Sequence, residues 1–288
     1  MQKILFIGAT GMLGKPVALE LLRAGFQLSL LARDVEKTQK LFPNIPVIKG
    51  DVLDPSSLET AMKDHEIVYT NLSVAQSSGK NEKQPEREGI NNIIEAAKKT
   101  GIKRIAYLSS LIKNYEGING FKWWVFEMKQ AAVNAVKRSG LHYSIFYPST
   151  FMECLDQQML QGSRLMLAGN SEAQMWFIAA KDFGIQVAWA LKKAGDTNQE
   201  YHIQGLEPFN FDEAAKVFIN NYKAPVKTMK APLTPIKFLG FFNQRMNYTY
   251  HICEALNKYP EKFESKKTWD DLGKPSITLA DYAASLKP

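Results

Sequence analysis

A short apolar strand that runs directly into three glycines constrains the fold of this chain more than any other feature. Residues 3–7 (KILFI) have the apolar character of a buried strand, and glycines follow at positions 8, 11 and 14. This spacing permits a sharp turn, a close approach of the backbone to a pyrophosphate, and tight packing of the next helix. An amphipathic pattern at 12–24 and a second strand at 27–32 supply the context that the motif requires. The segment therefore predicts a bound nicotinamide dinucleotide rather than an ordinary βαβ turn. The expected contacts are Gly8, Thr10, Gly11, Met12, Leu13 and Gly14.

Strand and helix patterns alternate through the first half of the chain. This alternation predicts an α/β fold, a Rossmann-type doubly wound parallel sheet whose ligand lies at the carboxyl ends of the strands. Gly25, Gly101 and Gly140 follow helical patterns, where left-handed caps are expected. The expected strands are 3–7, 27–32, 46–49, 66–71, 103–108 and 142–147, and the expected helices are 12–24, 35–41, 56–63, 86–100 and 121–139.

The regular alternation ends after Pro148. A helix near 182–193, a short strand at 201–203 and a helix at 212–222 are still expected, followed by a proline-containing and aromatic-rich stretch. We therefore expect a dinucleotide-binding Rossmann domain at 1–153 and a smaller, partly interleaved α+β lobe at 154–288. The strand near 201–204 is expected to return to the main sheet.

The composition, with 23% charged and 45% hydrophobic residues, is that of an ordinary soluble globular protein. No uninterrupted apolar run approaches the ~18 residues of a membrane span, and a strand begins at once, so we expect no signal peptide, no membrane partner and a cytoplasmic protein. Cys154 and Cys253 are far apart and the four histidines are scattered, so neither a disulfide framework nor a metal site is expected. The net charge of +7 favours anionic ligands, but the lysines are dispersed and no nucleic-acid motif is present.

Several motifs together resemble the atypical short-chain dehydrogenases/reductases, and specifically their NmrA-like branch. The resemblance extends over nearly the whole chain and implies a Rossmann fold and a bound dinucleotide. It does not specify a reaction, because the branch contains both reductases and proteins that bind the dinucleotide without turnover. The matching motifs are Gly8-Ala9-Thr10-Gly11-x-x-Gly14, Ala32-Arg33-Asp34, Gly50-Asp51, Asn91 to Ala97, Tyr107 to Ser110, Lys129, Tyr143 to Pro148, Phe177 to Gly184, and Tyr201 to Gly205 followed by Phe211 to Ala215.

Arg33 at the end of the second strand indicates NADP(H) rather than NAD(H). An NAD site places a carboxylate there for the ribose 2′-hydroxyl, whereas an NADP site places an arginine near the 2′-phosphate. Lys37 lies four residues on and can share the face of Arg33. The neighbouring Asp34 could bind a ribose hydroxyl, but the favoured interpretation is that it caps the helix at 35–41.

The remaining cofactor contacts are implied by the resemblance. It places Asp51 and Val52 beside the adenine, and Asn71, Leu72 and Ser73 beneath the nicotinamide ribose. Ser109, Tyr147 and Pro148 belong to the matching motifs around that end of the cofactor.

Lys129 is the candidate catalytic residue. Short-chain dehydrogenases carry a Tyr four residues before this lysine, and here that residue is Val125. The isoflavone-reductase type of the NmrA-like branch also lacks the Tyr and uses the lysine itself, which the resemblance extends to Lys129 as proton donor. Lys129 could instead bind only the ribose, or be an exposed helix lysine. Tyr115 could supply a displaced hydroxyl, although its spacing gives no support.

Aromatic residues are dense around the expected nicotinamide site and predict a flat apolar substrate pocket, although most are expected in the core. Residues 236–250 are interpreted as a lid in preference to an interfacial membrane helix. Two functions remain: an NADPH-dependent reductase of a small carbonyl, quinone or activated alkene, and a non-catalytic NADP sensor. A monomer or a homodimer is expected. The rings concerned are Phe121, Trp123, Trp124, Phe126, Trp176, Phe177, Phe238, Phe241, Phe242, Tyr248 and Tyr250.

Overall fold

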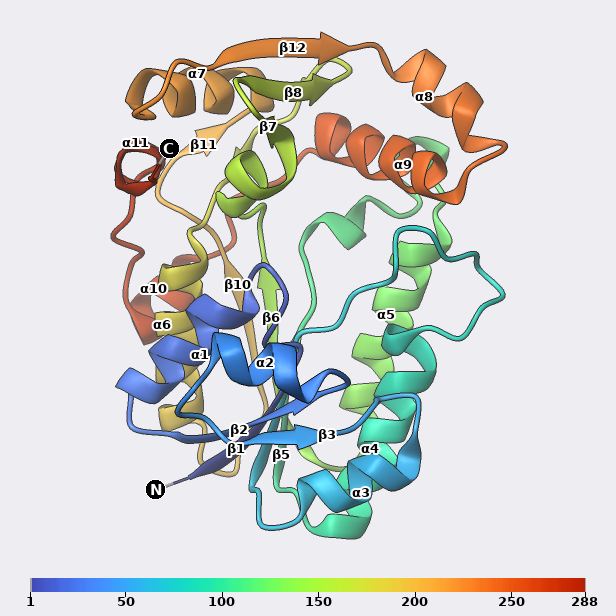
Figure 1. Ribbon diagram of the computed structural model, residues 1–288, viewed down its shortest axis with the longest axis vertical. Helices are drawn as coiled ribbons and strands as arrows, with labels where there is room; N and C mark the ends of the chain where they lie inside the picture. Colours follow the sequence, from blue (N-terminus) through green and yellow to red (C-terminus); the bar gives the residue numbers. More distant parts are fainter. Residues whose placement is uncertain (1, 288) are drawn as a thin grey trace.

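A seven-stranded parallel sheet forms the centre of the molecule in a computed structural model that describes residues 2–287 (Figure 1). The strand order reverses between β1 and β4, which creates a crevice at the carboxyl ends of these two strands. The predicted Rossmann-type doubly wound sheet is therefore confirmed. From one edge to the other the strands are β3 (Val47–Lys49), β2 (Gln27–Ala32), β1 (Lys3–Ile7), β4 (Ile67–Thr70), β5 (Arg104–Leu108), β6 (His142–Pro148) and β10 (Gln199–Ile203).

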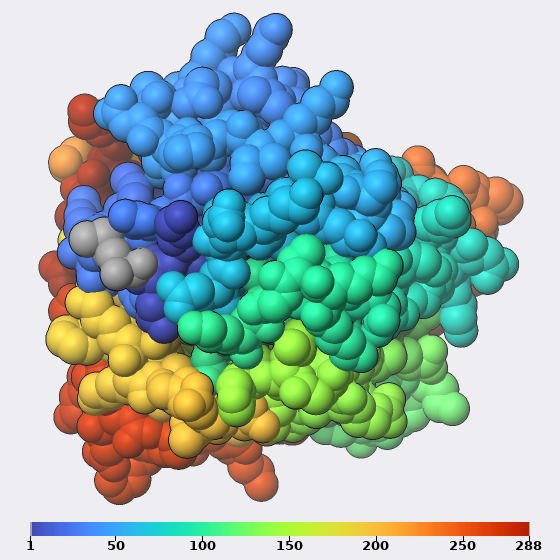
Figure 2. All heavy atoms as spheres, turned by 90° about the horizontal axis from the view of Figure 1, so that it is seen from below, coloured from blue at the N-terminus to red at the C-terminus, as the bar shows by residue number. Residues whose placement is uncertain are grey.

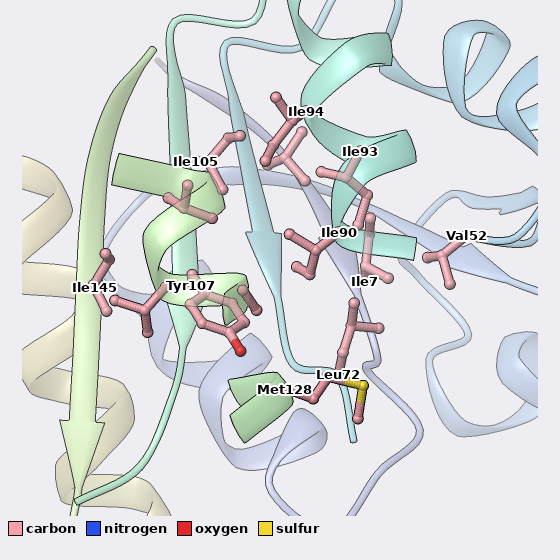
Figure 3. Packing of buried hydrophobic residues seen from close by; sticks show 14 of the residues in the cluster. Ile7, Val52, Leu72, Ile90, Ile93, Ile94, Ile105, Tyr107, Met128 and Ile145 are labelled. Atoms are coloured by element: carbon pink, nitrogen blue, oxygen red, sulfur yellow. The ribbon is translucent and has the colours of Figure 1, made fainter. Parts of the chain in front are cut away.

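Helices cover both faces of the sheet, and each face has its own hydrophobic cluster. On the left in Figure 1 lie α1 (Gly14–Arg23), α6 (Ala180–Lys193) and α10 (Lys266–Leu272). On the right lie α3 (Pro55–Met62), α4 (Ile90–Thr100) and α5 (Trp124–Lys137), while α2 (Val35–Leu41) connects β2 to β3. Figure 3 shows the cluster beneath α4 and α5, where isoleucines of the sheet and helix interdigitate around Tyr107.

A second lobe lies above the sheet in Figure 1. Its three-stranded sheet has the order β12–β8–β7, and β9 pairs with β11. The lobe adjoins the glycine loop, since the Gln158 amide lies 3.5 Å from the Met12 sulfur. Its elements are β7 (Leu160–Gln161), β8 (Arg164–Ala168), β9 (Met175–Trp176), β11 (Pro208–Phe209), α7 (Phe211–Asn221), β12 (Lys227–Ala231), α8 (Leu233–Gly240), α9 (Gln244–Lys258) and α11 (Leu279–Ser285).

Four short helical turns link these elements. They are the π-turns η1 (Pro85–Gly89) and η4 (Leu155–Met159), and the 3-10 turns η2 (Ile112–Tyr115) and η3 (Ile118–Gly120). Within residues 2–287, no helix combines the length and apolar character needed to cross a bilayer.

Local signals in the sequence explain most of the element ends. Gly25, Gly101 and Gly140 have φ values of 89°, 77° and 82°, as predicted for residues that end helices. Asp34 caps α2 by accepting a hydrogen bond from the Lys37 amide. Asn210 and Glu213 form a reciprocal capping box at the start of α7.

The prediction that most aromatic residues lie in the core is wrong for the α8 region. Phe238, Phe241 and Phe242 are 63%, 75% and 80% exposed. By contrast, Phe121, Trp123, Phe126 and Phe177 are buried, as are other rings of the main core. The pattern of aromatic residues did not distinguish these sets because neighbouring elements, not local sequence, decide which rings are covered.

Candidate functional site

The three glycines of the β1–α1 loop have different structural roles. Gly8 has φ +90°, and a side chain there would collide with the backbone of Asn71 at the end of β4. A side chain at Gly14 would collide with the carbonyls of Gly8 and Ala9, so this glycine permits close helix packing. At Gly11, however, a Cβ would meet only ordinary contacts, 3.5 Å from the Gly8 oxygen and 3.9 Å from Asn71 Nδ2. Space is therefore open at the middle glycine of the loop.

Backbone N–H groups of this loop lack a hydrogen-bond partner among the described residues. Within residues 2–287, the N–H groups of Met12 and Leu13 have no acceptor, and no side chain caps the start of α1. The helix dipole adds positive potential at the same point. Free N–H groups and an uncovered glycine fit the pyrophosphate of a dinucleotide.

The end of β2 presents cations to solvent. Arg33 and Lys37 are exposed, and neither makes an ion pair with any residue that the structure describes. Asp34, in contrast, has its carboxylate engaged with the Lys37 amide at 2.9 Å. The arrangement favours recognition of a phosphate over recognition of a ribose hydroxyl.

The residues after β3 and β4 lie at the same edge of the sheet. Asp51 accepts a hydrogen bond from the Leu53 amide, and the Val52 carbonyl accepts one from Asn92. Val52 is buried, and its side chain packs on Gly89. After β4, Asn71 is half-buried beside Gly11, Leu72 is buried in the core and Ser73 is exposed.

The hydroxyl groups after β5 have no hydrogen-bond partner, whereas the tyrosine hydroxyl near the end of β6 is already hydrogen-bonded. The hydroxyls of Ser109 and Ser110 are buried without a hydrogen-bond partner, so a ligand or a water molecule can satisfy them. Tyr147 instead donates its hydroxyl to Glu200 at 2.7 Å, beside Lys137 of α5. Its side chain is therefore engaged between β6 and β10, and Pro148 beside it is buried.

Lys129 forms an ion pair with a buried carboxylate. Its Nζ lies 2.5 Å from Glu86 Oε1, and the two side chains are 15% and 0% exposed. The Tyr107 hydroxyl donates to the same carboxylate oxygen at 3.3 Å, while Oε2 has no partner. Burial, followed by the Glu86 charge, raises the pKa of Tyr107, which keeps this phenol a neutral donor. Lys129 is thus neither an exposed surface lysine nor an isolated one.

No hydroxyl replaces the missing tyrosine on α5. Val125, four residues before Lys129, is 1% exposed and packs in the core. Tyr115 is also unavailable, since it is buried against Phe121 and Tyr259.

Sequence reasoning missed one residue of this site, Glu86, whereas Tyr248 was among the aromatic residues expected near it. Glu86 lies in the π-turn η1, in a Pro-Glu-Arg-Glu run that has the composition of an exposed helix start. Tyr248 reaches the site from α9 and packs edge-on against Trp123 at 5.0 Å. Its pKa is raised to about 12 by burial and then by the nearby Glu86 carboxylate and Cys154 thiol. Glu86 is recognised as a site residue only because its buried carboxylate faces Lys129 in the folded protein. The spacing of residues in the sequence does not predict this contact.

A hollow of about 760 Å³ adjoins the glycine loop on the outer side of α1. Thr10, Gly11 and Met12 line it, together with Lys15 and Gln158. Arg33, Asp51 and Asn71 do not line it, so it shares only the glycine loop with the predicted cofactor contacts.

Comparison with known proteins agrees with this geometry. A family model described as NAD(P)H-binding matches residues 8–172. The chain is 24% identical to a photosystem II assembly factor, Ycf39, of Guillardia theta, over 88% of this chain and 81% of that protein. It is 23% identical to an NAD(P)H azoreductase of Xenophilus azovorans, over 97% and 96% of the two chains.

Solved structures share the fold over almost the full length. Triphenylmethane reductase of Citrobacter, complexed with NADP(H), superposes with a TM-score of 0.75 at 19% identity, covering 98% of this chain and 99% of that one. An NADPH-dependent quinone oxidoreductase of Escherichia coli gives 0.72 at 20% identity, covering 98% of each chain.

Proposed function

The chain belongs to the NAD(P)H-binding family whose model spans its glycine loop and most of its sheet, and from this premise we propose that it is an NADPH-dependent reductase. Its acceptor is a small apolar carbonyl, quinone or activated alkene, and Lys129 supplies the proton. The cofactor contacts are those of the glycine loop together with Arg33, Lys37, Asp51, Val52, Asn71, Leu72, Ser73, Ser109, Lys129, Tyr147 and Pro148.

The buried Lys129–Glu86 ion pair carries this proposal. Removing two charged groups from water is costly unless they pair closely, so an ion pair with one side chain fully buried needs a reason to be retained. A charged lysine at the nicotinamide end of the site can donate a proton to an oxygen that gains negative charge. Glu86 keeps the ammonium oriented, and the Tyr107 hydroxyl steadies Glu86.

The chain's residues divide the work of the reaction. When bound, the reduced nicotinamide supplies a hydride. Lys129 then gives one proton from Nζ to the acceptor oxygen and recovers it from water. Quinones and conjugated alkenes suit a site without the tyrosine because their developing charge is delocalised, so they need less help from an acid.

Aromatic side chains of both lobes support an apolar acceptor. Trp123 at the start of α5 stacks on His251 at 5.6 Å and meets Tyr248 edge-on, both on α9. Trp123 is buried, so the partly exposed Tyr248 and His251 are the rings of this cluster that can present an apolar surface to an acceptor. The azoreductase and triphenylmethane reductase named above act, by their names, on aromatic compounds, which agrees with this choice.

NADPH oxidation by the purified protein tests the proposal. The wild type should oxidise NADPH with at least one member of a panel of quinones, aromatic aldehydes and azo dyes. Gly11→Val is the variant for comparison. The backbone at Gly11 is outside the left-handed region and an added Cβ has room, so we expect the variant to fold. Its side chain would fill the space expected for the pyrophosphate. The variant should neither bind nor oxidise NADPH. Turnover undiminished in folded Gly11→Val would place the cofactor elsewhere.

A second function, an NADP sensor without turnover, is favoured by one observation. Val125 occupies the position of the usual acid and is buried, so α5 supplies no tyrosine hydroxyl to the reaction. The relatives that are photosystem II assembly factors are compatible with such a role. Tight NADPH binding with no oxidation by any acceptor in the panel would favour the sensor.

A further inference from the structure

Four large apolar side chains are exposed at the tip of the α8–α9 hairpin. These residues, which form the aromatic tip, are Phe238, Leu239, Phe241 and Phe242, and they are 63%, 51%, 75% and 80% exposed. In Figure 1 this tip forms the upper right corner, away from the glycine loop. In Figure 2, seen from below, orange atoms of the same region extend past the rest of the molecule on the right. All four side chains are exposed, so packing within the described residues does not account for them.

The tip is held firmly by the packing beneath it. Gly240 is the buried residue of α8, and a Cβ there would lie 3.1 Å from the Asn247 backbone, so the two helices cross closely. Asn243 caps α9 by accepting a hydrogen bond from the Met246 amide at 3.2 Å. The rings of Phe238 and Phe242 meet edge-on at 5.8 Å. The exposed rings are therefore displayed on a defined turn between two helices.

The charged residues along the segment that carries the tip have one sign. Residues 214–253 contain six Lys or Arg and no Asp or Glu. Lys237 and Arg245 flank the aromatic tip directly, and both are exposed. Lys237 also lies 5.3 Å from the ring centre of Tyr250. Lys230 on the adjoining β12 is paired with Asp212, so it contributes less.

We propose that this tip docks the protein on an anionic lipid bilayer. Aromatic and leucine side chains enter the boundary between headgroups and acyl chains, while flanking Lys and Arg contact anionic headgroups. The interaction is peripheral and independent of the reductase proposal.

The positive charge beside the aromatic tip favours an anionic bilayer over a second copy of the chain as its binding partner. Two copies meeting through the aromatic tip would bring Lys237 and Arg245 of each into proximity, with no carboxylate in the segment to compensate. An apolar protein partner would leave the flanking cations without a role. An anionic bilayer satisfies both the rings and the cations.

Co-sedimentation with vesicles tests the proposal. Wild type should bind phosphatidylcholine vesicles that contain about one third phosphatidylglycerol, and bind pure phosphatidylcholine at least ~tenfold more weakly, because each basic residue near the surface adds affinity. Phe241→Ala/Phe242→Ala should lower binding to the anionic vesicles by roughly tenfold or more, because apolar burial supplies the rest. Since both rings are exposed, the variant should fold normally.

Matched controls distinguish binding through the aromatic tip from non-specific binding to vesicles. Trp189→Ala removes an aromatic residue of α6 that is 47% exposed, and should leave binding unchanged. Lys237→Gln/Arg245→Gln should weaken binding to anionic vesicles, whereas Lys63→Gln/Arg138→Gln, of equal charge, should have a smaller effect. Equal loss in both charge variants, or binding that survives in Phe241→Ala/Phe242→Ala, would overturn the proposal. So would a wild-type dimer in solution that this double alanine variant dissociates.

Discussion

Arg33 and Asp34 are adjacent residues of opposite charge, and only one of them is free to recognise a ligand. The Asp34 carboxylate is used to cap α2, while the Arg33 guanidinium is exposed without an ion pair among the residues described. A planar guanidinium keeps its charge and matches a phosphate through two parallel hydrogen bonds. This local division of roles is the residue-level basis for expecting NADP(H).

Replacing Arg33 tests that choice. Wild type should bind NADPH more tightly than NADH in a calorimetric titration. Arg33→Ala should lose roughly ten- to a hundredfold of NADPH affinity and little NADH affinity, because one charge-assisted contact to the 2′-phosphate is removed. Lys40→Ala, an exposed lysine later in the same helix, is the control and should change neither. Equal binding of both dinucleotides by wild type would contradict the assignment.

Residue-level prediction succeeded where a role depends on backbone geometry. The glycine spacing predicted the turn at Gly8, the open space at Gly11 and the close helix packing at Gly14. Each of these features follows from the absence of a side chain. Glu86 was missed because its role depends on facing Lys129 across a 43-residue separation. The sequence placed the rings of the aromatic tip in a lid, and local pattern could not show that no described element covers them.

At the scale of elements, the main sheet and its helices were predictable because each repeats a clear pattern. Apolar runs bounded by polar turns predicted the strands from β1 to β6, although β3 is short and only partly buried. The capping residues indicated several helix ends. The strands of the second lobe gave weaker signals. β7, β9 and β11 are two residues long, and β12 is largely exposed, so neither length nor periodicity marks them.

At the scale of the whole molecule, the carboxylate of Glu261 fastens the segment after α9 to the sheet edge. Glu261 accepts hydrogen bonds from Gln204 at 2.6 Å and Ser149 at 2.9 Å. Burial raises its pKa from 4.5 to about 7 despite these donors. The folded protein therefore holds a proton that the unfolded chain releases above about pH 4.5.

This proton makes stability depend on pH in a defined direction. The contribution of Glu261 is fully present below its unfolded pKa of 4.5 and is lost as pH rises through about 7. As the pH rises from about 5 to about 8, deprotonation of Glu261 should lower the free energy of unfolding by up to about 3 kcal/mol.

Glu261→Gln should remove that dependence. Urea unfolding at both pH values measures it, with the exposed Glu207→Gln as control. The fall in unfolding free energy from the lower to the higher pH should be smaller in Glu261→Gln than in wild type or the control. The same fall in all three proteins would show that Glu261 does not carry a retained proton.

The central claim, that Lys129 supplies the proton, is tested most directly by the turnover number for NADPH oxidation at saturating cofactor. Lys129→Met alone would leave the Glu86 carboxylate buried and unpaired, so the decisive comparison is Lys129→Met/Glu86→Gln against Glu86→Gln. Lys98→Met on the exposed face of α4 serves as the control. With the acceptor that wild type uses best, removal of the lysine should lower kcat by roughly 10²–10⁴-fold, while the Kd for NADPH changes far less. An intact kcat with weakened NADPH binding would contradict the claim and make Lys129 a ribose ligand.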